Sequence, residues 1–368
     1  MKITVDATPL LLRSAGVKNY LYHWLSHLAD AGNGHSVRLF PLLPGLGRLN
    51  HERSVLGGAL TLSRLACLYL ANLPGNPVLD WTTGSAEIFH VTNQVRQPLR
   101  GARLTATLHD MTCWLMPQLH TPQNVDADRR FSERVLKRAE GLMAVSENTR
   151  RDAIRILDLK PERVTTIHSG VAQPYFDATE EKAAEVRSQY RLLRPYVLYI
   201  GTIEPRKNVV RLLDAWKQLP ADVRDEYGLV LAGPMGWVSP DTARRIESEP
   251  DVTYLRYIPE AEVPGLTFGA SVFAYPSLYE GFGFPVAQAM ACGVPVLTSN
   301  NSCLPEISGD AALHVDAKSP EEIRAGLERL LTSASLRAKL GARGRELAQQ
   351  YRWEVCAKKS WEFFEKLG

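Results

Sequence analysis

Cysteine is scarce in this sequence and has no metal-binding or disulfide spacing. The chain contains five cysteines, and no two of them form a C-x-x-C pair. An odd number of scattered thiols argues against a disulfide framework and against a structural zinc site. We therefore expect a protein of the reducing cytosol. The cysteines are Cys67, Cys113, Cys292, Cys303 and Cys356.

Long apolar runs are also missing. No uncharged apolar stretch approaches the ~20 residues that a membrane-spanning helix needs. The first residues, Met1 to Asp6, read as a β-strand and not as a signal peptide. These features predict a cytoplasmic protein.

The chain has little net charge. Its formal charge is +3, which is too small to indicate nucleic-acid binding. The charge is uneven, because residues 1–178 carry 20 Lys/Arg against 15 Asp/Glu (+5) and residues 179–368 carry −2. Eight of the nine histidines also lie in the first half. A mildly basic half is compatible with an anionic lipid or an anionic acceptor.

The length of 368 residues favours two domains. Short apolar strand-like runs alternate with helical segments, a pattern typical of parallel sheets flanked by helices. We predict an α/β protein of two Rossmann-like, doubly wound domains. The domains are predicted at 1–178 and 190–350, with a linker within 172–194. The amphipathic segment 351–368 is predicted to cross back to the first domain.

The predicted strands fall into two series. The first comprises 3–5, 37–40, 88–91, 104–108, 142–145 and 164–167. The second comprises 196–200, 229–232, 252–255, 271–275 and 294–297. In such sheets, ligands bind beyond the carboxyl ends of the strands.

The most informative motif is SLYEGFGFP at 277–285, between a predicted strand and a predicted helix. Glycines at such a turn free the backbone, and the helix start carries a partial positive charge. This combination suits the diphosphate of a nucleotide. Glu280 would repel phosphate, so its expected partners are sugar hydroxyls or N–H groups of its own turn. Together these features indicate a nucleotide-sugar.

A second motif, GTIEPRKN at 201–208, follows the strand 196–200 and includes Thr202. Arg206 can bind two phosphate oxygens with its guanidinium, and Lys207 supplies a compact charge. Cations at this place would stabilise the charge that builds on a departing diphosphate. An exposed basic helix start is the alternative, but cations there oppose the helix dipole. The functional interpretation is therefore favoured.

Two further loops are weaker candidates. Gly16 lies in RSAGVKNY at 13–20, which is either a ligand-covering loop or an ordinary turn. His109 follows the strand 104–108, where an imidazole could bind a sugar hydroxyl or transfer a proton. A solvated loop histidine is the commoner case.

Two other segments have plain structural explanations. Asp126 and Asp128 form an acid-x-acid pattern, but they stand directly before the helical run 129–138 and are interpreted as helix-capping acids. No metal is inferred. The apolar segment 54–73 contains Arg64 and Tyr69, and either lies on a membrane surface or packs on its own domain. Packing is the more frequent behaviour.

Taken together, the motifs resemble glycosyltransferase family 4, the group 1 glycosyltransferases with the GT-B fold, and particularly bacterial mannosyl- and rhamnosyltransferases. The resemblance is densest over 196–316. It rests on GTIEPRKN, SLYEGFGFP, VSENTRRD at 145–152, and AMACGVPVLTSNNSCLPEISGDAAL at 289–313. It implies two domains facing across a cleft, and a retaining transfer of a sugar from a nucleotide-sugar without a metal.

The resemblance also implies residue roles. Arg206 and Lys207 would hold the diphosphate, with Thr202 beside them, and Glu280 would contact the donor sugar. Gly16 would cover the phosphate, and His109 would lie near the transferred sugar. The remaining implied donor contacts are the amides of Gly281, Phe282, Gly283 and Phe284, and a base pocket at Tyr257 and Ile258.

One position departs from the family pattern. A second glutamate is expected eight positions after the first, and this chain has Gln288 there. Glutamine keeps a hydrogen bond to the ribose but loses about 1–2 kcal/mol of charge-assisted strength. A nucleotide-sugar-binding protein with weakened catalysis is therefore one alternative.

The expected donor is GDP-mannose, with a UDP-sugar second, and the expected acceptor is a glycan or lipid-linked glycan. Contact with the inner face of a membrane is a further expectation. A dinucleotide-dependent oxidoreductase would need G-x-G-x-x-G after the first strand, and residues 8–16 do not supply it.

Overall fold

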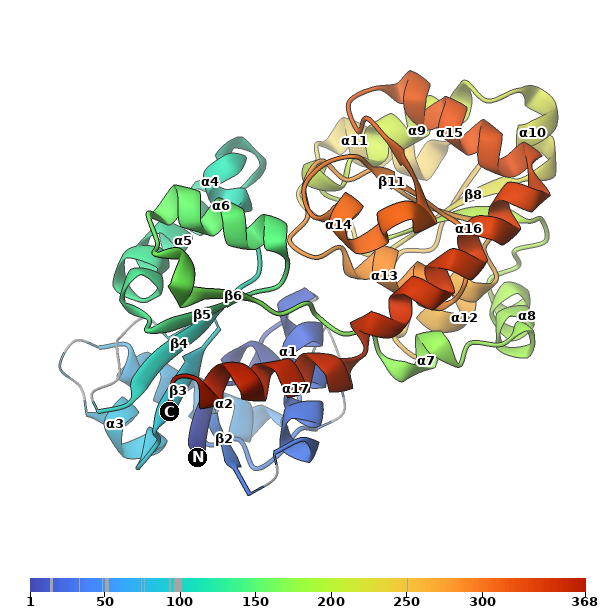
Figure 1. Cartoon of the computed structure of the whole chain (residues 1–368). Helices are drawn as coiled ribbons and strands as arrows, with labels where there is room; N and C mark the ends of the chain where they lie inside the picture. The colour runs from blue at the N-terminus through green and yellow to red at the C-terminus, as the bar shows by residue number, and fades with distance from the viewer. Residues whose placement is uncertain are drawn as a thin grey trace. The chain divides into compact units, whose positions relative to one another are not determined.

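The chain folds into two α/β units, each built on its own parallel sheet. The first unit comprises Met1–Gly170 with Trp353–Gly368, and the second comprises Val171–Arg352. Figure 1 colours both by position in the chain. The computed structural model describes residues 1–13, 16–32, 34–47, 49, 53–73, 75, 77–92, 94–95, 101–249 and 251–368.

The first unit contains a six-stranded parallel sheet in the order β2-β1-β3-β4-β5-β6. The strands are β1 (Lys2–Asp6), β2 (Ser36–Phe40), β3 (Ile88–Val91), β4 (Arg103–Leu108), β5 (Gly141–Ala144) and β6 (Val164–Thr166). The helices are α1 (Gly16–Asp30), α2 (Gly58–Ala71), α3 (Val78–Thr83), α4 (Thr112–Leu115), α5 (Pro122–Arg134), α6 (Glu147–Leu157) and α17 (Trp353–Glu365). Short 3₁₀ turns are η1 (Thr8–Leu11), η2 (Pro117–Leu119), η3 (Leu136–Arg138) and η4 (Pro161–Arg163).

The C-terminal helix α17 packs against α1, which places it in the first unit (Figure 1). The Trp361 Nε1 donates to the Leu28 carbonyl at 3.0 Å, and the Trp24 Nε1 donates to the Ser360 hydroxyl at 2.9 Å. Both indoles are buried. Apolar packing and satisfied indole N–H groups therefore hold the end of the chain on the first unit.

The second unit contains another six-stranded parallel sheet, in the order β12-β11-β10-β7-β8-β9. The strands are β7 (Tyr196–Ile200), β8 (Gly228–Ala232), β9 (Val252–Tyr254), β10 (Val272–Tyr275), β11 (Val296–Ser299) and β12 (Ala312–Val315). The helices are α7 (Gln173–Phe176), α8 (Glu180–Gln189), α9 (Val209–Lys217), α10 (Ala221–Glu226), α11 (Pro240–Ser248), α12 (Val263–Phe268), α13 (Phe284–Ala291), α14 (Leu304–Ser308), α15 (Pro320–Thr332) and α16 (Ala334–Leu347). The 3₁₀ turns are η5 (Pro205–Lys207), η6 (Gly309–Ala311) and η7 (Ala348–Tyr351).

The strand order of the second unit reverses between β7 and β10. Chain order runs outward from β7 to β8 and β9 on one side, and from β10 to β11 and β12 on the other. The connections that follow β7 and β10 therefore lead toward opposite sides of the sheet. Wound sheets bind their ligands at such a switch point, beyond the carboxyl ends of the strands. Both sequence motifs that predict nucleotide-sugar binding follow these two strands.

The predicted linker segment contains α7 and α8, and α8 packs on α12 in the second unit. The predicted α/β class with two wound sheets is confirmed, but two local expectations differ from the structure. Strand β12 was not predicted, because His314 interrupts its short apolar run. Helix α5 begins at Pro122 with Thr121 as its N-cap, so Asp126 and Asp128 are not capping acids.

Instead, the side chain of Asp126 pairs with Arg130 one turn later. Asp128 is half-buried, and burial raises the pKa of its carboxyl group. Within the described ranges, no group of three His, Cys, Asp or Glu side chains has the geometry to hold a metal ion. In the same part of the chain, no helix combines the length and apolar character needed to cross a bilayer.

Candidate active site

The switch point of the second unit brings a buried cluster of charges together. Arg206 and Lys207 lie on η5, in the loop that follows β7. Glu280 lies in the loop that follows β10, four residues before the start of α13. All three side chains are largely buried, with exposed fractions of 13%, 13% and 8%. The structure therefore joins the two motifs that the sequence identified separately.

Direct hydrogen bonds hold this cluster. The Lys207 Nζ lies 2.8 and 3.0 Å from the two carboxylate oxygens of Glu280. The Arg206 Nη1 donates to Glu280 Oε2 at 2.9 Å and to the Tyr279 carbonyl at 2.6 Å. Its Nη2 donates to Glu204 Oε1 at 2.7 Å. Two cations and two carboxylates thus meet in one buried group with no net charge.

The cluster keeps Glu280 ionised. Burial alone would raise the pKa of this carboxyl group, but the nearby charges of Arg206 and Lys207 outweigh it. Hydrogen bonds from Lys207 and from the Ser277 hydroxyl add to the effect, and the pKa falls to about 2. Glu280 is therefore a carboxylate at neutral pH, able only to accept hydrogen bonds.

Several residues without a predicted role fix the two loops. Asn208 adopts a left-handed conformation (φ 62°), and its Nδ2 donates to the carbonyls of Pro276 and Ala317 at 2.8 and 2.6 Å. The Tyr275 hydroxyl accepts from the Lys207 Nζ at 2.6 Å. Asn208 is the last residue of the GTIEPRKN motif. Its place directly after Arg206 and Lys207 is the sequence feature that could have indicated its loop-fixing hydrogen bonds. Glu204 lies in the same motif.

The glycine turn before α13 is built as the sequence suggests. Gly283 has φ 81°, and a Cβ there would lie 2.8 Å from Leu304 Cδ2, so glycine is required at this position. The Glu280 N–H donates to the Ser302 hydroxyl at 3.1 Å, which ties the turn to the loop after β11. The start of α13 places partial positive charge beside the cluster.

The remaining predicted donor contacts of the second unit lie around this edge. Gln288 is half-buried in α13, and Thr202 follows β7 directly. Tyr257 is 37% exposed and Ile258 is buried, both in the segment after β9. Backbone bonds join the neighbouring loops, because the N–H of Gly236 donates to the Ile203 carbonyl at 2.9 Å.

Two predicted residues belong to the first unit. Gly16 is the exposed first residue of α1, and Ser14 and Ala15 of the same loop lie outside the described residues. His109 follows β4, and its ring packs edge-on against Tyr20 at 4.9 Å. Burial lowers the pKa of His109 to about 4, so the imidazole is neutral at pH 7. It is not the solvated loop histidine that is common after strands.

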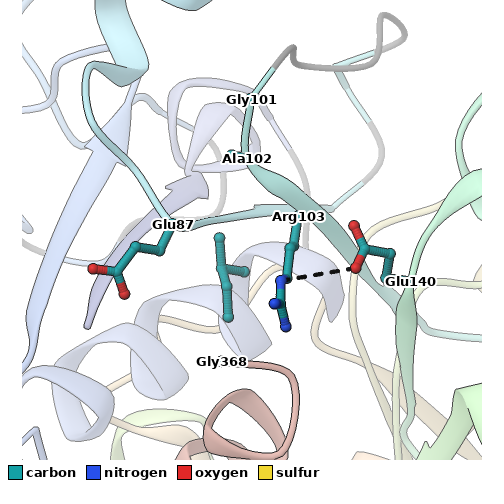
Figure 2. Close-up of a pocket in the computed structure, with 7 residues that line it drawn as sticks. Glu87, Gly101, Ala102, Arg103, Glu140 and Gly368 are labelled. Carbon is teal, nitrogen blue, oxygen red and sulfur yellow. Dashed lines mark ion pairs between the residues drawn. The ribbon is translucent and has the colours of Figure 1, made fainter.

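A separate pocket lies in the first unit, at the edge of the sheet formed by the amino ends of its strands. Figure 2 shows Arg103 beside Glu140, and Glu87 across from them. The Arg103 Nε lies 3.9 Å from Glu140 Oε2. These residues stand at the amino ends of β3, β4 and β5. Because ligands of wound sheets bind at the carboxyl ends, this pocket is separate from the candidate site.

Comparisons with known proteins agree with the geometry. The model of "Glycosyl transferases group 1" matches residues 184–347, and that of "Glycosyltransferase Family 4" matches residues 14–172. O-antigen chain mannosyltransferase B of Escherichia coli is 36% identical over 263 residues, which cover 70% of this chain and 69% of that protein. Serotype-specific mannosyltransferase WbdA of Escherichia coli is 29% identical over 63% of this chain, but the match spans only 29% of WbdA.

Solved structures show the same fold. Sucrose-phosphate synthase from Thermosynechococcus elongatus superposes with a TM-score of 0.74 at 22% identity, over 100% of this chain and 99% of that chain. Anabaena Alr3699/HepE in complex with UDP-glucose superposes with a TM-score of 0.73 at 17% identity, over 99% of both chains. Two wound sheets with these structural neighbours establish the GT-B fold.

Proposed function

Because the chain belongs to the group 1 glycosyltransferases of family 4, and is therefore a glycosyltransferase, we propose that it transfers mannose from GDP-mannose with retention of configuration. The mannosyltransferase names of its relatives support the choice of sugar. The single observation that carries the proposal is the buried contact of Arg206 and Lys207 with Glu280 at the β7–β10 switch point.

The cluster supports this chemistry step by step. A departing diphosphate gains negative charge, and a fixed guanidinium and ammonium whose side chains are largely buried stabilise that charge. The start of α13 contributes in the same sense. Glu280 is an ionised acceptor, suited to the hydroxyl groups of the donor sugar. The protein thus supplies positioning and electrostatic stabilisation of the leaving group.

Retention is proposed on the ground of the family resemblance. In this mechanism the acceptor hydroxyl attacks the face from which the nucleoside diphosphate leaves, and the leaving phosphate accepts the proton of that hydroxyl. We propose that no metal is needed, because Arg206 and Lys207 can donate hydrogen bonds to the phosphate oxygens in place of Glu204 and Glu280. Roles for Gly16 and His109 toward the donor are proposed on family grounds alone.

The acceptor is proposed to be a glycan or a lipid-linked glycan. The relative named for an O-antigen chain supports a polysaccharide product. We further propose that the protein works in the cytoplasm, in peripheral contact with the inner face of a membrane. A UDP-sugar is the second candidate donor.

The alternative of a weakened binding protein rests on Gln288, which stands where the family pattern has a second glutamate. Glutamine there weakens ribose recognition and leaves the charge cluster intact. Donor turnover by the unmodified chain excludes this alternative, because a binding protein does not release free nucleoside diphosphate.

The test begins with a thermal-shift panel of GDP-, UDP-, ADP- and dTDP-sugars, because only a ligand that favours the native state raises the melting temperature. GDP-mannose is expected to give the largest shift. The same donors are then incubated with a mannose-terminated acceptor, and the anomeric configuration of the product is read by NMR. A product of inverted configuration, or a shift with UDP-sugars alone, contradicts the proposal.

A further inference from the structure

One lysine of the first unit is buried without an acidic partner. Lys18 lies in the first turn of α1 and has an exposed fraction of 0%. Its ammonium donates to the Leu12 carbonyl at 2.8 Å and to the Arg53 carbonyl at 2.6 Å. Among the described residues, no carboxylate forms an ion pair with it. Two uncharged carbonyl groups therefore solvate a buried cation.

The surroundings of Lys18 oppose its charge. Burial removes water from the ammonium, and two carbonyl dipoles replace that water only in part. Burial therefore lowers the pKa of Lys18 from 10.5 to about 8, so the side chain is still mostly charged at pH 7. The start of α1 carries a partial positive charge, which also repels a cation in the first turn. A charge that costs stability in two ways indicates a functional role for this lysine.

The two carbonyl groups belong to loops that follow different strands. Leu12 comes directly after η1, in the connection from β1 to α1, and Arg53 lies in the connection from β2 to α2. Strands β1 and β2 are parallel neighbours in the sheet, so both connections leave the same edge. The Val55 N–H also donates to the Leu10 carbonyl at 3.2 Å. Lys18 therefore ties two loops to the start of α1 at the edge where wound sheets bind ligands.

Gly16, the first residue of α1, is not required by the fold. Its φ lies outside the left-handed range, and no atom of the described residues lies within 4 Å of a Cβ built there. Alanine would fit and would lose less conformational entropy on folding. A glycine that the backbone does not need is typical of a place where a ligand approaches closely. The first N–H groups of a helix have no acceptor within the helix, so they can donate to such a ligand.

We propose that Lys18 is a positioning residue of the transfer reaction, which holds the start of α1 so that the N–H groups of Gly16 and Val17 donate to the diphosphate of the donor. The ammonium fixes the backbone at Leu12, just ahead of α1, and fixes the loop after β2 at Arg53. Its charge adds to the positive potential of the helix start. The inference rests on the proposed function and deepens it, because it gives the first unit a share in stabilising the leaving group.

The first test is Lys18→Met, which keeps a long unbranched side chain but removes the charge and both hydrogen bonds. Turnover is measured with GDP-mannose and a mannose-terminated acceptor. We expect kcat to fall at least ~10-fold and the donor KM to change less than ~3-fold, because the amides act on charge that develops as the diphosphate leaves. The melting temperature should stay within about 4 °C of wild type, since removal of a buried cation offsets the lost hydrogen bonds. Lys160→Met, at an exposed position of the same unit, is the matched control.

A double-mutant cycle then tests whether Lys18 acts through Gly16. Gly16→Ala should lower kcat at least ~10-fold at an unchanged melting temperature, because the added methyl group obstructs the ligand and not the fold. If the two residues act as one unit, the double variant should lose at most about 3-fold more than the more damaging single variant. Additive losses overturn the proposal.

Other outcomes also count against the proposal. A raised donor KM with unchanged kcat contradicts it, and a melting temperature lowered by more than about 10 °C with full turnover per folded molecule makes Lys18 a structural residue. If Lys18→Met does not fold, Lys18→Gln, which keeps an amide donor, takes its place, and unfolding of both variants overturns the proposal. Failure of the wild type with every nucleotide-sugar overturns the proposed function and this inference with it. Equal kcat of Lys18→Met and an active wild type overturns the inference alone, so the two failures are distinguishable.

Discussion

Lys207 and Glu280 are 73 residues apart in the chain, yet the lysine Nζ lies within hydrogen-bond distance of both oxygens of the glutamate. The contact joins the loop after β7 to the loop after β10. It therefore spans the point at which the strand order of the second sheet reverses. Each of the next three predictions changes one member of this cluster.

Substitution of Lys207 by alanine should lower turnover at least ~100-fold, because the departing diphosphate loses a fixed cation. The measurement is the steady-state release of nucleoside diphosphate with saturating donor and acceptor. Lys217→Ala is the control, since Lys217 is half-exposed on α9 and pairs with Glu249 outside the cluster. Near-normal turnover of Lys207→Ala would refute the assignment.

Loss of Glu280 should change the pH dependence of stability. Its pKa is lowered from 4.5 to about 2, so the stability that its ionised form contributes is present above pH 4.5 and is lost as the pH falls through 2. That contribution is at most roughly 3 kcal/mol. The gap in urea midpoint between wild type and Glu280→Gln should therefore narrow between pH 5 and pH 3. A gap that is constant over this range contradicts the ion-pair account.

Glu204 should act as a positioning residue for Arg206. Glu204→Gln keeps an oxygen for the Arg206 Nη2 but loses the charge, whereas Glu204→Ala loses both. We expect kcat to fall roughly 10-fold in the first variant and further in the second. A purely structural role would lower the melting temperature in proportion, so both quantities are measured. Glu185→Gln, on the exposed side of α8, is the control.

Restoring the family residue at position 288 should tighten donor binding. Gln288→Glu gives the ribose hydroxyls a charged acceptor, worth about 1–2 kcal/mol, or roughly 5- to 30-fold in Kd. Calorimetric titration with GDP and GDP-mannose measures the change. Unchanged affinity for both ligands would show that this side chain does not reach the ribose.

Helix α17 should be needed for the stability of the first unit. Trp361 is 5% exposed and donates to the Leu28 carbonyl, so alanine there leaves both a cavity and an unpaired acceptor. We expect a loss of about 3–5 kcal/mol in the free energy of unfolding. Glu362→Ala, on the exposed side of the same helix, should change it by less than ~0.5 kcal/mol. Equal effects would contradict the packing of α17 on α1.

The parallel sheets were predictable because their strands are short runs rich in apolar and β-branched residues, and because helical segments separate them. Strand β12 was missed because two of its four residues are only half-buried and one is His314. The start of α5 was misplaced because Thr121 and Pro122, a strong start signal, were overlooked in favour of the acids that follow.

The cations and the carboxylate of the site were identified from the sequence, since their motifs follow strands that end at one edge. Their mutual pairing was not, because the partners expected for Glu280 were hydroxyls or its own turn. The two side chains are 73 residues apart in the chain, and the order of strands in the sheet decides how close their loops lie. Neither motif contains that information. The roles of Glu204 and Asn208 depend on that register, so they also required the structure.

The pairing of two cations with two carboxylates limits which ligands can bind at the charge cluster. An anion that approaches Arg206 and Lys207 meets groups already satisfied by Glu204 and Glu280, so it must compete with them. Inorganic phosphate offers few donors to the displaced carboxylate of Glu280, which would lose its hydrogen bonds from the two cations and keep the one from the Ser277 hydroxyl. The sugar of a nucleotide-sugar carries hydroxyl groups that can donate hydrogen bonds to the Glu280 carboxylate. Binding of the whole donor is therefore favoured over binding of inorganic phosphate.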